Sequence, residues 1–135
     1  MTSIVIPDKV EYIGNNAFKN NSGLNGGYLT NIVIGKNVQY IGDDAFYNEY
    51  LHVYFDSFLR DNPGIVYTVT SYAEIPPGLG SGAPFPVTAA RKGKLYIPKG
   101  CRNIYAQNGY VDPDFGFIII PMWGDIFTNI IEIEE

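Results

Sequence analysis

Residues 3–18 read SIVIPDKVEYIGNNAF, and residues 31–46 read NIVIGKNVQYIGDDAF. At an offset of 28 residues the two stretches are identical at nine of sixteen positions, and almost all of their differences are between polar side chains. Copies of one structural unit must bury the same side chains against their neighbours, so this pattern predicts a repeat architecture. In the first copy the shared residues are Ile4, Val5, Ile6, Val10, Tyr12, Ile13, Gly14, Ala17 and Phe18.

Each copy is predicted to begin with a short strand and to continue into a loop that packs inward. In the first copy, residues 3–6 are rich in β-branched side chains, and Pro7 with Asp8 indicates the turn that ends the strand. Gly14 supplies the backbone freedom for the next bend. The side chains expected to pack inward after the turn are Val10, Ile13, Ala17 and Phe18.

The links that follow the two copies differ in length. Residues 20–28 are polar and glycine-rich, whereas the second link is only residues 47–50, so we expect the longer loop to be dispensable. Without its six extra residues, a basic period of 22 leads from Leu29 to Leu51. This period predicts a degenerate third strand at residues 51–55, because the alternative register would bury the carboxylate of Asp56 without a partner. Leu51, Val53 and Phe55 would then point inward, with His52 and Tyr54 on the open face.

The rest of the chain is predicted to form short elements and connections. Residues 76–86 are rich in proline and glycine and indicate a long connection. Residues 101–108 are predicted to form a short helix that Gly109 ends, with Ile104 and Tyr105 pointing inward. Further strands are predicted at residues 65–72, 95–97, 117–120 and 130–133.

Composition places the chain among globular proteins of one domain. It has 135 residues, of which 46% are hydrophobic and 17% are charged. Its formal net charge is −5 and no basic cluster offsets it, which argues against nucleic acid as a partner. The densest apolar run, residues 117–121, is too short to span a bilayer, so we expect no membrane insertion. A single cysteine cannot form an internal disulfide, so the fold must be held by packing.

No pattern in the sequence predicts an enzyme, a cofactor or a metal site. His52 is the only histidine, and it has no cysteine nearby with which to bind a metal. Cys101 has no recognisable base beside it, so a packed side chain is the better interpretation. The glycines at residues 78–82 are followed by Pro84 and Pro86 where a dinucleotide-binding motif would need a helix.

The repeated residues resemble a known family. Residues 4–18 fit the pattern I-x-I-P-x-x-V-x-x-I-G-x-x-A-F, and residues 32–46 fit it with Gly35 in place of the proline. This pattern resembles the BspA-like class of leucine-rich repeats, found in surface proteins of anaerobic gut and oral bacteria. Residues 94–105 look like the closing segment of many such proteins, and residues 123–132 resemble their last turn.

The resemblance implies a mostly β leucine-rich-repeat solenoid with short helical turns, about two to three repeats and an irregular C-terminal cap. We expect a single domain over residues 1–135, with repeats in residues 3–72 and a closing segment in residues 73–135. The repeats would be residues 3–28, residues 29–50 and a degenerate copy at residues 51–72.

The family also implies a non-catalytic interaction module of a secreted or surface-displayed bacterial protein with an adhesion-like role. The partner would be a protein or a glycan, and eleven tyrosines supply contact area of the kind that binding surfaces use. The alternative is a purely structural cap of a longer leucine-rich-repeat surface protein. The candidate binding face is Ser3, Val5, Asn31, Val33, His52 and Tyr54.

A homodimer is a further expectation. The strand at residues 3–6 starts almost at Met1, and no element is predicted before it that would cover Ile4, Val10 and Ile13. An end with exposed apolar side chains and unpaired strand edges recruits another chain. We therefore expect two copies to associate through this N-terminal end.

Overall fold

The computed structural model describes residues 3–19, 28–82, 84–107, 110–111, 118–120 and 122–134, with only the backbone described at 110–111 and 118–120. The strands are β1 (Ser3–Ile6), β2 (Tyr12–Ile13), β3 (Asn31–Ile34), β4 (Tyr40–Ile41), β5 (Thr68–Ser71), β6 (Gly78–Leu79), β7 (Lys94–Ile97), β8 (Tyr110–Val111), β9 (Ile118–Ile120) and β10 (Ile130–Glu132). The helices are α1 (Glu49–Val53), α2 (Phe55–Asp61), α3 (Val87–Lys92), α4 (Arg102–Tyr105) and α5 (Trp123–Ile126).

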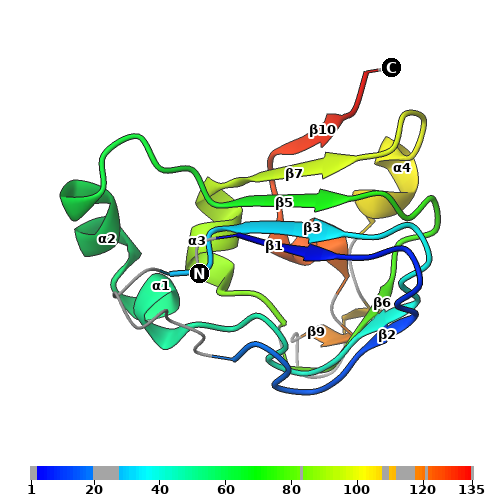
Figure 1. Cartoon of the computed structure of the whole chain (residues 1–135), viewed down its shortest axis with the longest axis horizontal. Helices are drawn as coiled ribbons and strands as arrows, with labels where there is room; N and C mark the ends of the chain where they lie inside the picture. Colours follow the sequence, from blue (N-terminus) through cyan, green and yellow to red (C-terminus); the bar gives the residue numbers. More distant parts are fainter. Residues whose placement is uncertain are drawn as a thin grey trace.

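Two parallel sheets form the framework (Figure 1). The larger has the strand order β1-β3-β5-β7-β10, and the smaller has the order β2-β4-β6. Ile4 pairs with Ile32 in the first sheet and Tyr12 pairs with Tyr40 in the second, which is the offset of 28 residues seen in the sequence. The predicted alignment of the first two copies is therefore confirmed, and parallel sheets with short helices fit a repeat fold.

The third strand of the large sheet lies later in the chain than predicted. Residues 51–55 belong to α1 and α2, and β5 instead pairs with β3, with Val69 beside Ile32. The Asn48 side chain caps α1 by accepting a hydrogen bond of 3.0 Å from the backbone N–H of Leu51. Leu51, Phe55 and Phe58 are all buried, and their spacing of four and three residues lines one face of a helix. The prediction that Val53 points inward is also wrong, since it is 55% exposed.

The third copy continues through residues 76–86, which were expected to be a connection only. Within this segment β6 pairs with β4, so that Leu79 lies beside Ile41. Phe85 then takes the position of the aromatic residue that ends each earlier copy. The rings of Phe18 and Phe46 stack at 5.4 Å, and those of Phe46 and Phe85 stack at 5.6 Å.

The closing segment is hydrogen-bonded to the backbone of the third copy. The Tyr105 hydroxyl donates to the Ala73 carbonyl at 2.6 Å and lies 2.7 Å from the Ser71 hydroxyl. The Trp123 indole N–H donates to the Pro77 carbonyl at 2.9 Å, and the indole packs 5.5 Å from the Phe85 ring. The aromatic side chains at this end are therefore buried without leaving these two polar groups unpaired.

The remaining strand predictions are confirmed in part. Strands occur within residues 65–72, 95–97, 117–120 and 130–133 as β5, β7, β9 and β10, although residues 65–67 are not in a strand. Helix α4 lies within the predicted helix, and Tyr105 is buried there, but Ile104 is exposed.

The first copy is less buried than predicted. Ile13 is buried, whereas Val10 and Phe18 are only partly buried and Ala17 is exposed, because no further repeat packs in front of them. Residues 20–27 of the long loop and Gly109 lie outside the described residues. Tyr28, which was counted with the loop, stacks at 4.9 Å on Tyr50, so the loop's last residue takes part in the packing.

We predict that Phe46→Ala lowers the free energy of unfolding by about 3–5 kcal/mol. Phe46 is 3% exposed and its ring contacts both Phe18 and Phe85, so truncation leaves a cavity in the middle of the stack. Chemical denaturation followed by circular dichroism measures the change. An unchanged midpoint would contradict the repeat alignment.

Two buried tyrosines should respond to the loss of the hydroxyl in opposite directions. The Tyr67 hydroxyl is buried without a hydrogen-bond partner among the described residues, so Tyr67→Phe should raise the free energy of unfolding by about 1 kcal/mol. Tyr105→Phe removes bonds to Ala73 and Ser71 and should lower it by about 1–3 kcal/mol. The two variants are matched controls in the same denaturation assay. Equal effects would show that the Tyr67 hydroxyl is paired after all.

Candidate functional site

The outer face of the large sheet is the broadest candidate binding surface. Along β3, β5 and β7 the inward side chains are buried and the outward ones are partly or fully exposed. The strand register aligns outward side chains from all five strands into one line across the sheet. This central row consists of Val5, Val33, Thr70, Tyr96 and Ile131.

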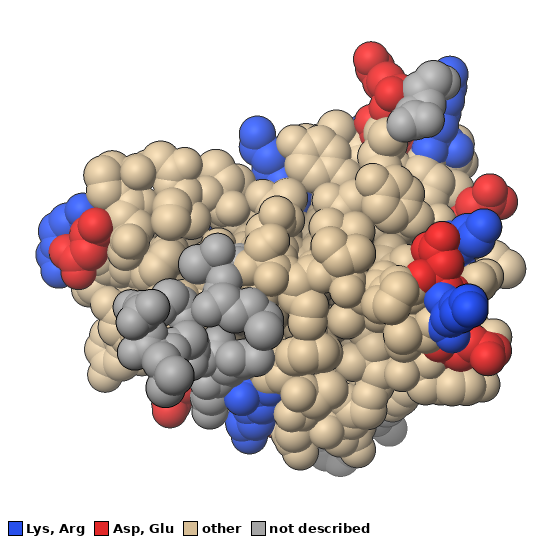
Figure 2. Space-filling model, viewed as in Figure 1, with Lys and Arg blue, Asp and Glu red and all other residues tan. Residues whose placement is uncertain are grey.

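A second row runs beside it, nearer to the starts of the strands. Its members are polar or charged, and the register places Ser3, Asn31, Thr68 and Lys94 side by side. Figure 2 shows the effect of the two rows on the surface: the middle of this face carries no acidic or basic side chains, and charges gather mainly at its edges. The largest gathering lies at the edge where the strands end.

Four of the six predicted binding residues lie on this face. Val5 and Val33 belong to the central row, and Ser3 and Asn31 belong to the row beside it. Their role in binding stays a prediction. The register also adds Thr70, Tyr96 and Ile131, which the sequence analysis missed because links of unequal length separate their strands. The alternating pattern of residues 68–71 and 94–97 was the available signal.

His52 and Tyr54 are not on the sheet face, because the segment that holds them is helical. His52 lies on α1 and packs toward α3, with its Nδ1 atom 3.4 Å from the Thr88 hydroxyl. Its ring also lies 5.5 Å from the ring of Tyr47. Tyr54 caps the end of α1 and is 55% exposed. Neither residue therefore contributes to the central row.

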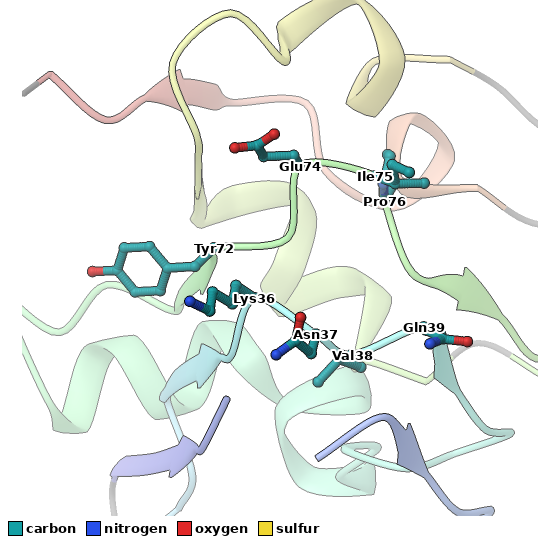
Figure 3. A pocket seen from close by; sticks show the side chains of 8 residues that line it. All are labelled: Lys36, Asn37, Val38, Gln39, Tyr72, Glu74, Ile75 and Pro76. Carbon is teal, nitrogen blue, oxygen red and sulfur yellow. The ribbon is translucent and has the colours of Figure 1, made fainter. Parts of the chain in front are cut away.

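Two adjoining hollows lie where the strands of the large sheet end. The larger, of about 690 Å³, opens between residues 36–39 after β3 and residues 72–76 after β5 (Figure 3). The smaller, of about 610 Å³, extends along the end of β1 to Asp8. Lys36 and Tyr72 line both, so together the hollows form an extension of the outer face toward its charged edge.

The hollows offer contact surface and a few polar groups. The larger is lined by the oppositely charged side chains of Lys36 and Glu74 and by the side chain of Ile75, which is 81% exposed. The amides are already engaged: Gln39 bonds to Glu11 at 3.2 Å, and the Asn37 amide donates to the Asp8 carbonyl at 2.8 Å. Such a lining is suited to binding rather than to chemistry.

No catalytic or metal-binding arrangement is present among the described residues. They contain no group of three or more histidine, cysteine and acidic side chains that could hold a metal ion. Burial, assisted by the negative charges of Glu74 and Glu132, raises the pKa of the Cys101 thiol, which is the wrong direction for a nucleophile.

The glycine-rich segment at residues 78–82 has a structural explanation. A Cβ atom at Gly80 would lie 2.6 Å from the backbone nitrogen of Asp43, and the Gly82 N–H donates to the Asp43 carboxylate at 3.1 Å. The third copy can approach the second this closely only because Gly80 has no side chain. The segment is therefore a repeat contact and not a phosphate-binding loop.

Comparison with known proteins identifies the repeats. Residues 1–53 match a family model described as "BspA type Leucine rich repeat region (6 copies)". No curated protein and no solved structure gives a significant match. The resemblance found in the repeated sequence is thus confirmed for this part of the chain. Over the described residues, no helix has the length and hydropathy needed to cross a membrane.

Cys101 should be alkylated slowly at neutral pH. Its raised pKa reduces the thiolate fraction, so iodoacetamide should react more slowly than with a cysteine in an unstructured peptide. Removing a negative charge with Glu74→Gln should lower the pKa and speed the reaction modestly. A pH profile of the alkylation rate measures both effects. A rate above that of the peptide would contradict the assignment.

Proposed function

Because residues 1–53 carry BspA-type leucine-rich repeats, we propose that this chain is a non-catalytic interaction module of a secreted or surface-displayed bacterial protein. The family is generally found in surface proteins and is typically non-catalytic. In this proposal the repeats form a short solenoid, the closing segment caps it, and the outer face of the large sheet binds a partner.

The observation that carries the proposal is the uncharged central row. It crosses all five strands, and its members include two valines, one of which, Val5, is 66% exposed. Contiguous apolar surface surrounded by polar groups is typical of an interaction site, since solvent-exposed faces otherwise carry mixed charges. Figure 2 supports this interpretation, because the acidic and basic side chains surround the face rather than cover it.

The chemistry of the face favours a protein partner. Valine, isoleucine and threonine methyl groups gain free energy by excluding water, which a flat apolar partner surface allows over a large area. A glycan is the second candidate, because the Tyr72 ring is 49% exposed beside the hollows and an aromatic ring can stack against a sugar.

The structural alternative, in which the domain only caps a longer repeat protein, has its own support. Tyr105 and Trp123 bond the closing segment to the third copy and cover the end of the core. Under this alternative the central row would contact no partner. Binding experiments on the face therefore distinguish the two proposals.

We predict that Thr70→Arg weakens partner binding by at least about tenfold, which corresponds to about 1.4 kcal/mol. The change places a charge in the middle of the uncharged row, where an apolar partner would have to bury it. Arrays of purified extracellular proteins and of glycans provide the partners, and surface plasmon resonance gives the affinities.

Asn103→Arg is the matched control, since Asn103 is an exposed residue of α4 outside both rows. Binding to proteins that only Thr70→Arg weakens would support the proposal. Binding to glycans alone would favour the second candidate. A partner whose affinity neither variant changes, or the absence of any binding, would contradict the assignment of this face.

A further inference from the structure

The first copy exposes the side chains that the other copies bury. Ala45 is fully buried in the second copy, whereas its equivalent Ala17 is exposed. Likewise Ile32 is fully buried, whereas Ile4 is only partly buried and packs against the edge of the core. The surface formed by β1, β2 and residues 14–18, called here the front end, is therefore shaped as a repeat contact.

The hydrogen-bond ladders also stop at the front end. The Gly42 N–H donates to the Ile13 carbonyl at 2.8 Å, and the Asp43 N–H donates to the Asn15 side chain at 2.9 Å. The third copy repeats the first of these bonds, from the Gly80 N–H to the Ile41 carbonyl at 2.9 Å. Among the described residues, no acceptor receives the equivalent N–H groups of Gly14 and Asn15.

We propose that the front end binds the front end of a second copy of this chain, forming a two-fold dimer. Identical edges can pair in antiparallel fashion, because each strand edge carries both N–H donors and carbonyl acceptors. The stacked rings are likewise self-complementary: the outer side of the Phe18 ring faces away from Phe46 and can meet the same ring of the second copy.

The opposite end of the stack cannot serve as the partner surface. There the Phe85 ring is covered by Trp123 at 5.5 Å and by Phe127 at 5.4 Å. The last strand also carries Glu132, and Glu134 follows it, which blunts that edge with negative charge. A head-to-tail contact is therefore blocked, and only a front-to-front contact remains, which closes after two copies.

Charge balance favours association at this end. The chain carries a formal net charge of −5, which repels a second copy on average. The described first copy, in contrast, contains two acidic and two basic residues, namely Asp8, Glu11, Lys9 and Lys19. The front end is thus locally neutral, and the excess negative charge lies elsewhere on the molecule.

Sedimentation equilibrium from micromolar to millimolar concentrations of the full chain tests the proposal. We expect the mass to rise from one copy to two and no further. Ala17→Arg should weaken the dimer at least about tenfold, because Ala17 is exposed in the single copy but would be covered in the dimer. Ala106→Arg, at an exposed alanine after α4 in the closing segment, should leave the dimer unchanged.

Circular dichroism and thermal unfolding establish that both variants fold, since each changes an exposed position. A single-copy mass at every concentration would overturn the proposal. So would a dimer that Ala17→Arg does not weaken, or one that both arginine variants weaken equally. Open-ended assemblies larger than two copies would overturn the two-fold arrangement.

Discussion

Each core side chain in this fold packs against its own equivalent in the next copy. A parallel register with no slippage enforces this arrangement, as the pairs Ile4–Ile32 and Ile32–Val69 show. Aromatic rings therefore stack on aromatic rings, and the same side-chain oxygen accepts from the next backbone N–H, as with Asn15 and Asp43. A substitution in one copy disturbs two neighbours, because the contacts are made copy to copy rather than through one central core.

The stack has to stop somewhere, and the closing segment shows what stopping requires. An apolar stack that ended in water would leave both hydrophobic surface and backbone groups uncovered. Here Trp123 and Phe127 cover the Phe85 ring, while the Tyr105 hydroxyl and the Trp123 indole N–H satisfy carbonyl groups of the third copy. Large aromatic residues with one polar atom suit this position because they meet both needs at once.

The sequence predicted the first two copies closely, because identical residues recur there at one offset. It did not predict the third, since Ser71 stands where the earlier copies have isoleucine and its hydroxyl is satisfied by Tyr105. The helical spacing of Leu51, Phe55 and Phe58 after the capping residue Asn48 was readable, but the assumed period concealed it. Likewise the rows of the outer face depend on register across links of unequal length, which no local pattern encodes.

The unequal links have a consequence for how such a chain can change. Neighbouring strands of the large sheet are separated by as few as 26 residues, from Val69 to Leu95, and by as many as 37, from Ile32 to Val69. Helices α1 and α2 occupy the longest of these links and lie beyond the ends at which the strands begin (Figure 1). Because loop closure costs little for added length, whole segments can be gained or lost there while the strands keep their pairing. The fold thus behaves as a chassis whose exchangeable parts all mount on one side, which leaves its outer face free to evolve separately.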